Sequence, residues 1–254
     1  MKKWSIGILI ILLTGMLAAC GNSKQAEGKD KKILELATSA DFPPFESHDK
    51  SGDIVGFDID LASYIAKQLG YELKVKDMKF DGLIGALQAN RVDMVMAGMS
   101  ATEKRRNNVD FSKEYNRSGE MFIFKKGKQF RDLEGLKGKT IGVQLGTIQA
   151  EGADKLAEKY GFTVKKLDSA NIIAEELASN RIDVGYLDKT VAKGFVKKQD
   201  LNGFDDPTTS SPGMGIAFPK GSGLTKKVDK VIEKMESNGE LDKLKNKWLA
   251  DYQE

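Results

Sequence analysis

The chain has 254 residues, with 40 Lys and Arg against 37 Asp and Glu, and its formal net charge is +3. Nucleic-acid binders usually carry a clustered basic excess, so this balance argues against nucleic acid as a partner. A single cysteine excludes an intrachain disulfide. Residues 33–254 exceed the roughly 100 to 150 residues most common for one domain, so we expect two lobes.

The amino terminus has the order of a bacterial export signal. Basic residues precede a short apolar run over residues 6–13, and small residues then lead to Cys20. The run is too short for a membrane-spanning helix, which needs about 20 apolar residues, so we predict a signal peptide over residues 1–19. Residues 20–32 contain the cysteine and a polar stretch without apolar periodicity, which predicts a flexible linker.

The sequence Leu17-Ala18-Ala19-Cys20 resembles the lipobox of bacterial lipoproteins. In those proteins the cysteine becomes the acylated first residue of the mature chain. The resemblance therefore implies lipidation of Cys20, for example with palmitate, and an anchor on the extracytoplasmic face of the cell membrane. The alternative interpretation is a buried thiol that lies at this position by chance.

Strands and helices alternate in the first part of the chain. Strands are predicted where apolar residues alternate or run together, and helices where they recur every three or four residues. The predicted strands are residues 33–38, 73–76 and 92–97, and the predicted helices surround residues 61–69 and 83–87.

The same order recurs later in the chain. The predicted strands are residues 140–145, 163–167 and 182–187, with helices at residues 153–160 and 172–178. The sequence of residues 87–93 also matches that of residues 177–183, although Asn-Arg-x-Asp can arise wherever a helix end precedes a strand. Two β-α-β-α-β units are the simplest interpretation of this repeated order of strands and helices.

Two such units predict an α/β fold with mainly parallel sheets, covered by helices on both faces. Ligands of open α/β sheets bind outside the carboxyl ends of the strands. The loops at those ends are residues 39–46, 97–106, 144–149 and 187–190. The amphipathic segment 224–249, broken at Asn238-Gly239, predicts helix that packs on the core.

Ordered motifs over residues 33–248 together resemble the amino-acid class of periplasmic-type solute-binding proteins, which serve ABC importers. The motifs are PFE (44–46), GFDIDL (56–61), AGMSATEKR (97–105), DFS (110–112), LKGK (136–139), GVQLGT (142–147) and GMGIAF (213–218). The resemblance implies two lobes joined by two hinge crossovers, one of residues 33–118 with 214–254 and one of residues 119–213. It implies a monomer that delivers a free amino acid to importer permease subunits, without cofactor or metal ion.

A closed cleft must pair both the carboxylate and the ammonium of a free amino acid, because a desolvated lone charge is costly. An arginine suits the carboxylate, since its planar fork makes two parallel hydrogen bonds. The resemblance gives this role to Arg105, with Arg106 as its competitor, whereas an anonymous run of such charges indicates a solvated helix face. Ala97, Gly98 and Ser100 precede it, where glycine permits close backbone approach and a hydroxyl can donate or accept.

The ammonium group needs a carboxylate. Asp188 follows the predicted strand 182–187 and resembles the family aspartate that accepts the α-amino group. Asp183 is the alternative, but it lies at the start of that strand, away from its carboxyl end. Thr147, with Gln144 of the same loop, is expected to contact the ligand from the second lobe.

Phe42 and Phe80 match the aromatic walls of the family site, although aromatic residues at strand ends more often belong to the core. Several family members that bind histidine, arginine or glutamine have an acid where this chain has Ser39. Asp41, two residues on, could recognise a distal cation instead. The sequence of residues 143–149 is similar to that of arginine-type proteins. We expect arginine first, then lysine or histidine, then glutamine.

The expected mechanism is a hinge, in which Thr147 and Asp188 close over a ligand held by the first lobe. A dehydratase on the same fold is a less favoured alternative. The single histidine, His48, lies in a polar loop, and the consecutive Ser47-His48-Asp49 is not how a spatial triad is recognised. A sensory or adhesive lipoprotein that uses the same cleft is a further alternative.

Overall fold

The structure, a computed structural model, describes residues 32–209 and 211–252. The predicted signal peptide, the lipidation of Cys20 and nearly all of the predicted linker lie outside the described residues. No helix in the described ranges is both long and apolar enough to cross a membrane.

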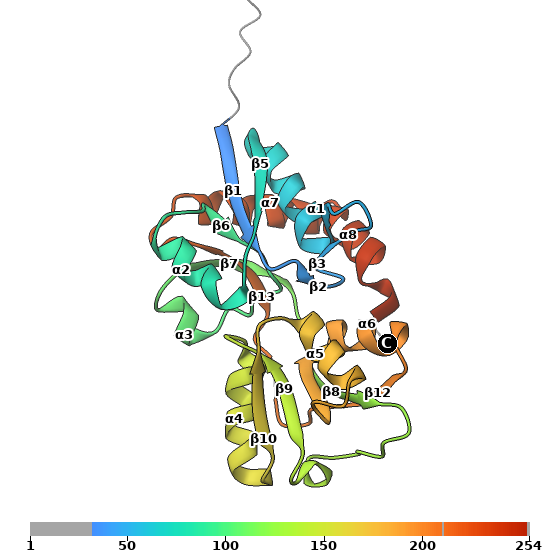
Figure 1. Ribbon diagram of the computed structural model, residues 1–254. Coiled ribbons are helices and arrows are strands. Elements are labelled where there is room, and N and C mark those ends of the chain that lie inside the picture. The colour runs from blue at the N-terminus through green and yellow to red at the C-terminus, as the bar shows by residue number, and fades with distance from the viewer. Residues whose placement is uncertain (1–31, 210, 253–254) are drawn as a thin grey trace, which may run out of the picture. The chain divides into compact units, whose positions relative to one another are not determined.

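Two five-stranded sheets form the framework (Figure 1). The first, in the order β5-β1-β6-β13-β7, contains β1 (Lys32–Thr38), β5 (Tyr71–Asp77), β6 (Met94–Val95), β7 (Asp110–Asn116) and β13 (Met214–Phe218). The second, in the order β10-β9-β11-β8-β12, contains β8 (Glu120–Lys125), β9 (Thr140–Gln144), β10 (Thr163–Leu167), β11 (Val184–Asp188) and β12 (Leu201–Asp205). A small antiparallel sheet contains β2 (Asp41–Phe42), β3 (Glu46–His48) and β4 (Ile54–Val55).

Each five-stranded sheet contains one of the two predicted repeat units. Strands β5, β1 and β6 run parallel in the first sheet, as do β10, β9 and β11 in the second. The remaining two strands of each sheet pair in the antiparallel sense. The sheets are therefore parallel within the repeat units and mixed as a whole.

The chain passes between the two sheets twice. Residues 117–119 lead from β7 to β8, and residues 206–213, of which 210 is not described, lead back from β12 to β13. The backbone of Met214 follows the second passage directly and pairs with Asn116, which precedes the first. The two passages thus lie side by side where they leave the first sheet.

Helices cover both faces of each sheet (Figure 1). The first sheet carries α1 (Phe57–Leu69), α2 (Leu83–Gln88), α3 (Glu103–Arg106), α7 (Leu224–Ser237) and α8 (Glu240–Trp248). The second carries α4 (Ile148–Tyr160), α5 (Ala170–Ala178) and α6 (Lys189–Lys198). Short 3-10 turns are η1 (Phe80–Gly82), η2 (Glu134–Leu136) and η3 (Ala250–Tyr252).

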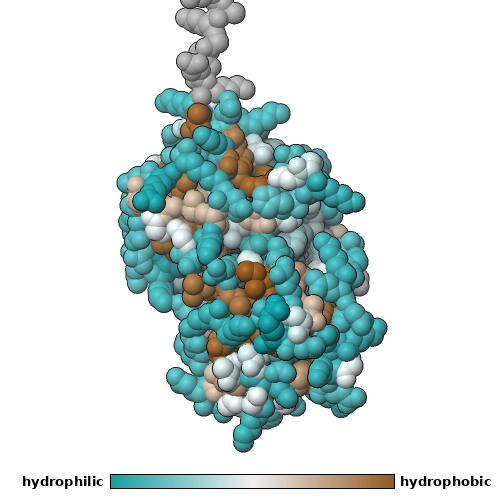
Figure 2. Space-filling model, in the orientation of Figure 1, coloured by the Kyte–Doolittle hydropathy of each residue, from teal (hydrophilic) through white to brown (hydrophobic). Residues whose placement is uncertain are grey.

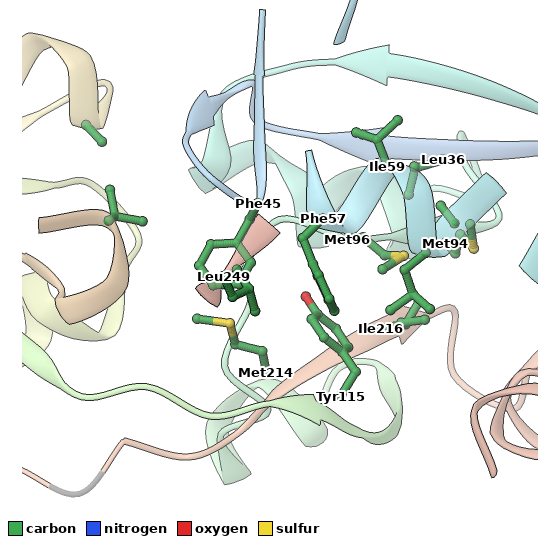
Figure 3. Packing of buried hydrophobic residues seen from close by; sticks show 14 of the residues in the cluster. Leu36, Phe45, Phe57, Ile59, Met94, Met96, Tyr115, Met214, Ile216 and Leu249 are labelled. Atoms are coloured by element: carbon green, nitrogen blue, oxygen red, sulfur yellow. The ribbon is translucent and has the colours of Figure 1, made fainter. Parts of the chain in front are cut away.

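Apolar side chains of β1 point alternately to the two faces of the first sheet and pack into the core on both. Leu34 and Leu36 pack in a cluster with Phe57 of α1, whereas Ala37 packs in a separate cluster with Leu83 of α2. Neighbouring side chains of a strand point to opposite faces, so one strand serves both clusters. Figure 3 shows Leu36 and Phe57 on the α1 side together with Met94 and Ile216.

The surface drawn in Figure 2 is largely hydrophilic, with apolar patches. In the described residues the exposed large hydrophobic side chains are Ile33 and Leu145. Leu145 directly follows β9, at the edge of the second sheet where the candidate site lies.

Candidate functional site

Loops from the carboxyl ends of strands in both sheets surround one cavity. Its lining residues are Phe42, Phe80, Gly98, Ser100, Arg105, Gln144, Thr147, Ile148, Gln149 and Asp188. All of the predicted ligand-binding residues except Ser39, Asp41 and Ala97 are in this group. The free volume inside is only about 20 Å³, which is room for about one water molecule. An amino acid can therefore enter only when the two sets of loops separate or their side chains move.

Arg105 lies in α3, a short helix that Thr102 starts by accepting a hydrogen bond from the Arg105 backbone N–H. The side chain is 9% exposed. Its guanidinium donates to the backbone oxygen of Ser100 at 2.8 Å and to that of Gly146 at 3.0 Å. It also lies over the ring of Phe80, with Cζ 5.3 Å from the ring centroid. These contacts hold the cation at the boundary between the two sheets.

Burial lowers the pKa of Arg105 to about 10, with the charge of Glu151 opposing the change, so the group remains a cation at neutral pH. Among the described residues it forms no ion pair, whereas its neighbour Lys104 pairs with Glu151 at 2.6 Å. A buried cation that is hydrogen-bonded only to neutral carbonyl groups suits an additional anionic partner.

Arg106, the predicted competitor, does not line the cavity. Its Nε donates to the backbone oxygen of Ala101 at 3.1 Å, and its guanidinium lies over the ring of Phe111. The two adjacent arginines therefore lie in different environments, and only Arg105 faces the cavity.

Asp188 is the last residue of β11 and the N-cap of α6. Its Oδ1 accepts hydrogen bonds from the backbone N–H groups of Thr190 at 2.8 Å and Val191 at 3.3 Å. Burial raises the pKa of Asp188 to about 7, although hydrogen bonds from Ser118 and from the two amides oppose the rise. The cavity thus contains a buried carboxyl group that a nearby cation would help to ionise.

The alternative, Asp183, does not line the cavity. Its Oδ2 accepts a hydrogen bond from the backbone N–H of Thr140 at 2.9 Å, and its counterpart in the first repeat, Asp93, accepts one from the N–H of Glu35 at 2.8 Å. Both aspartates therefore join the start of one strand to a neighbouring strand, which is a structural role.

Phe42 packs directly against Gly98. Gly98 has φ of 54°, and a Cβ added there would lie 2.7 Å from a carbon of the Phe42 ring. Only glycine combines this left-handed backbone with so close an aromatic neighbour. The Phe42 ring also stacks on Phe45, with centroids 6.0 Å apart. Its position is fixed from both sides.

The segment from the end of β9 to the first turn of α4 supplies Gln144, Thr147 and Gln149. The Thr147 hydroxyl donates to the backbone oxygen of Gln144 at 2.7 Å and accepts from the N–H of Ala150 at 3.1 Å, so it caps α4. Its one hydroxyl proton is therefore already used within the loop. Ile148 and Gln149 were not predicted as site residues, and they lie in the first turn of α4. The capping residue Thr147 directly before them indicates a helix start at this point, and this signal could have identified them.

Three predicted site residues lie elsewhere. Ala97 is buried in the cluster beside α2. Ser39 and Asp41 border a neighbouring groove instead of the cavity. The Ser39 hydroxyl donates to Oδ1 of Asp41 at 2.8 Å, and Oδ2 of Asp41 accepts from Gln144 and from the N–H of Ala170. Both Asp41 oxygens thus already accept hydrogen bonds within the protein, and the role of Asp41 toward a distal cation stays a prediction.

His48 lies in β3, away from the cavity. Its ring nitrogens contact the backbone oxygen of Gly52 at 3.0 Å and the carboxylate of Asp77 at 3.1 Å. The side chains of His48 and Asp77 are both close to half exposed. The first contact holds the turn after β3, and the second joins β3 to the end of β5.

Comparisons with known proteins identify the family of the chain. Residues 34–251 match the family described as bacterial extracellular solute-binding proteins, family 3. The arginine-binding extracellular protein ArtP of Bacillus subtilis (strain 168) is 44% identical over 254 residues, which cover 98% of this chain and 99% of that protein.

Two solved structures are also similar. An ancestral arginine-binding protein bound to arginine has a TM-score of 0.83 at 41% identity, covering 87% of this chain and 99% of that one. An ancestral amino-acid-binding protein, described as a precursor of cyclohexadienyl dehydratase, has a TM-score of 0.79 at 33% identity, covering 85% and 95%. The chain belongs to the bacterial extracellular solute-binding proteins of family 3.

Proposed function

We propose that this protein binds a free amino acid, with arginine preferred, in the cavity between its two sheets and delivers it to an ABC importer. The observation that carries the proposal is the buried guanidinium of Arg105, which forms no ion pair among the described residues. Its fork can exchange the carbonyl oxygens of Ser100 and Gly146 for the carboxylate of a ligand.

Asp188 accepts the ligand ammonium at the opposite pole. The group is buried at the end of β11 and already held by two backbone amides, so it can receive the ammonium without reorganising. Pairing with a cation favours its ionised form and opposes the effect of burial on its pKa. Arg105 and Asp188 together select a zwitterion over a simple cation or anion.

Phe42 and the two glutamines of the second sheet surround the side chain of the ligand. A planar guanidinium can stack on an aromatic ring and donate hydrogen bonds to the side-chain oxygens of Gln144 and Gln149. The similarity to ArtP and to the arginine-bound ancestral protein supports arginine first. Lysine or histidine, then glutamine, follow in the order expected from the sequence.

Binding involves a hinge motion of residues 33–118 with 214–254 relative to residues 119–213. The small free volume of the cavity supports this, because an amino acid needs more space than one water. Exposed contacts cross between these two parts, including Lys104 with Glu151 and Lys79 with Asp168. Such pairs are weak and can break on opening.

The cellular setting follows from the amino-terminal sequence. Export through residues 1–19, lipidation of Cys20 and a linker to residue 32 would keep the protein at the outer face of the membrane, within reach of permease subunits. Metabolic labelling with a palmitate analogue, compared between the full chain and Cys20→Ala, tests the anchor; label retained by the variant contradicts it.

Calorimetric titration with arginine, lysine, histidine and glutamine tests the binding function. We expect the tightest binding for arginine and a loss of at least about 100-fold for Arg105→Lys, because lysine cannot make the two parallel hydrogen bonds. The matched control is Arg106→Lys, which removes the same fork from the adjacent position and should change affinity less than about threefold. Equal losses in both variants would contradict the role of Arg105.

The dehydratase alternative is motivated by the similarity to the precursor of cyclohexadienyl dehydratase. Incubation with each bound amino acid, and with a prephenate-like acid, followed by mass spectrometry, should show no turnover. The sensory alternative is tested by uptake of labelled arginine in cells that lack this protein; unchanged uptake contradicts a role in import.

A further inference from the structure

Two motifs that do not line the cavity contact each other, because the backbone N–H of Asp58 donates to the backbone oxygen of Phe45 at 2.9 Å. Glu46, from Pro44-Phe45-Glu46, lies in β3, and Asp58, from Gly56-Phe57-Asp58, lies in the first turn of α1. Both side chains are 0% exposed. In the part of the chain that the structure describes, neither carboxyl oxygen of Glu46 has a hydrogen-bond partner, and nor does Oδ1 of Asp58. Such groups are costly to bury without a partner.

The other oxygen of Asp58 is fully used. Oδ2 accepts a hydrogen bond from the backbone N–H of Gly98 at 2.9 Å and another from the Tyr115 hydroxyl at 2.9 Å. Gly98 is the cavity residue with the left-handed backbone, against which Phe42 packs. Asp58 thus directly holds the backbone of Gly98, which lines the cavity.

The surroundings of the two carboxyl groups are apolar. Phe45 and Phe57 contact each other edge to face, and Phe57 stacks on Tyr115 with centroids 5.8 Å apart (Figure 3). Two negative charges side by side in such a place would repel each other with little screening. One proton shared between the two groups removes that repulsion.

The groups that act on Glu46 come from several elements, and they all oppose its ionisation. Burial raises the pKa of Glu46 well above its ordinary value, and the carboxylates of Asp58 in α1, Asp41 in β2 and Asp77 at the end of β5 raise it further. Burial raises the pKa of Asp58 to about 6, while hydrogen bonds from Gly98 and Tyr115 oppose the rise. Glu46 is therefore the member of the pair that retains a proton.

We propose that Glu46 carries a proton at neutral pH and uses it to donate a hydrogen bond to Oδ1 of the ionised Asp58, and that this acid pair positions Gly98 and Phe42 for ligand binding. The proton gives Oδ1 of Asp58 a partner and turns one unpartnered oxygen of Glu46 into a donor. Glu46 and Asp58 are then positioning residues, because they act through Gly98 and do not line the cavity.

Two variants, Glu46→Gln and Glu46→Leu, distinguish the effect of the hydrogen-bond donor from the effect of side-chain volume. The glutamine variant keeps a donor toward Asp58 and has no proton to lose, whereas the leucine variant has a side chain of similar size and no donor. Glu72→Gln, at an exposed position of β5, is the control for a generic loss of one acid.

Infrared spectroscopy at pH 7 tests the proton directly. The wild-type protein and Glu72→Gln should show a carboxylic-acid C=O stretching band that is weaker in Glu46→Gln, where other protonated groups such as Asp188 still contribute to it. Urea titrations compare the unfolding equilibrium constants of the wild type and of Glu46→Gln as pH increases above about 4.5. The constant of the wild type should rise relative to that of the variant by up to about tenfold per pH unit, because the folded wild-type chain retains a proton that the unfolded chain releases. No difference in the band or in the pH profile means that Glu46 is ionised and overturns the proposal.

L-arginine titration tests the positioning role, and this measurement alone rests on the proposed function. Glu46→Gln should bind within about twofold of the wild type, and Glu46→Leu should bind at least about tenfold more weakly, because the unpartnered Asp58 oxygen shifts its hydrogen bond with Gly98. Wild-type affinity in a folded Glu46→Leu protein overturns the positioning role. If Glu46→Leu does not fold, Asp58→Asn, which weakens acceptance from the Gly98 N–H, serves as the second variant; wild-type affinity there overturns the role equally.

Discussion

The side-chain amide of Gln144, at the end of β9, donates to the carboxylate of Asp41 in β2 at 3.0 Å. The same carboxylate oxygen accepts the backbone N–H of Ala170, at the start of α5, at 2.7 Å. Asp41 belongs to the part of the chain that precedes the first passage between the sheets, and both donors belong to the part that follows it. One buried carboxylate therefore links the two sets of loops at two points.

Replacement of Asp41 by alanine should weaken this link and speed ligand release. We expect affinity to fall about tenfold, mostly through faster dissociation, because hydrogen bonds to a charged group contribute about 1.5 to 3 kcal/mol each and the open form regains part of this from water. Stopped-flow dissociation of arginine and of glutamine measures the effect. Similar losses for both ligands indicate a link between the lobes; a loss confined to arginine indicates direct recognition of its distal cation and contradicts the link.

Lys79→Ala is the matched control for Asp41→Ala. Lys79 also crosses between the two parts, to Asp168, but its side chain is 66% exposed and that of Asp168 is 55% exposed. Exposed pairs contribute at most about 1 kcal/mol, so dissociation should change less than about fivefold.

Gly98→Ala should weaken arginine binding by about tenfold or more. The added Cβ would lie 2.7 Å from the Phe42 ring and must displace it from the cavity. Gly52→Ala is the control, because Gly52 also has a positive φ, of 90°, but has no atom within 4 Å of an added Cβ. Both variants carry backbone strain of about 1 kcal/mol, so a calorimetric difference between them isolates the contact with Phe42. Equal arginine affinities of the two variants would contradict a role of the Gly98–Phe42 contact in binding.

Arginine affinity should fall as pH decreases below about 7. Burial raises the pKa of Asp188 to about 7, so below that pH the group must release a proton before it can accept an ammonium. The decline should approach tenfold per pH unit, and calorimetry in buffers of different ionisation enthalpy should detect proton release at pH 6. Asp188→Asn should bind weakly and without this pH dependence. A flat profile in the wild type contradicts the pairing of Asp188 with the ligand ammonium.

The free energy of unfolding without ligand should fall as pH rises from about 4 to about 7. Burial raises the pKa of Asp188 to about 7 and that of Asp58 to about 6, both from an ordinary value of 3.8. Between these values the folded chain holds more protons than the unfolded chain, so increasing pH favours unfolding by up to about 1.4 kcal/mol per unit for each group. Urea denaturation at several pH values measures the slope, which Asp188→Asn should reduce; an unchanged slope in that variant contradicts the assignment.

The repeated strands and helices can be predicted because local apolar spacing determines them. Boundaries are less accurate where a cap, and not periodicity, sets the end of an element. The sequence predicts helix α4 from residue 153, but it begins at Ile148, because the Thr147 hydroxyl satisfies the N–H of Ala150. Strand β6 is predicted over residues 92–97, but only Met94–Val95 pair as a strand. The left-handed turn at Gly98 ends the ladder soon after.

The long-range pairings cannot be predicted from local patterns. Strand β13 inserts between β6 and β7, which lie about 100 residues earlier in the chain. Strand β8 pairs with β11 and β12, which follow it only after β9 and β10. The same limit applies to the site. Arg105 and Asp188 are indicated by motifs within single loops, whereas the partner of Asp41 is Gln144, on another sheet.

Three helices of the second sheet start at side chains that directly satisfy their first amide groups, namely Thr147, Ser169 and Asp188. Two of these, Thr147 and Asp188, also line the cavity. Any change of ligand preference made at these two positions would therefore also weaken a helix, at a cost of about 1 kcal/mol or more. Gln149 lines the same cavity without capping a helix, so new specificities could arise there while the scaffold keeps its stability.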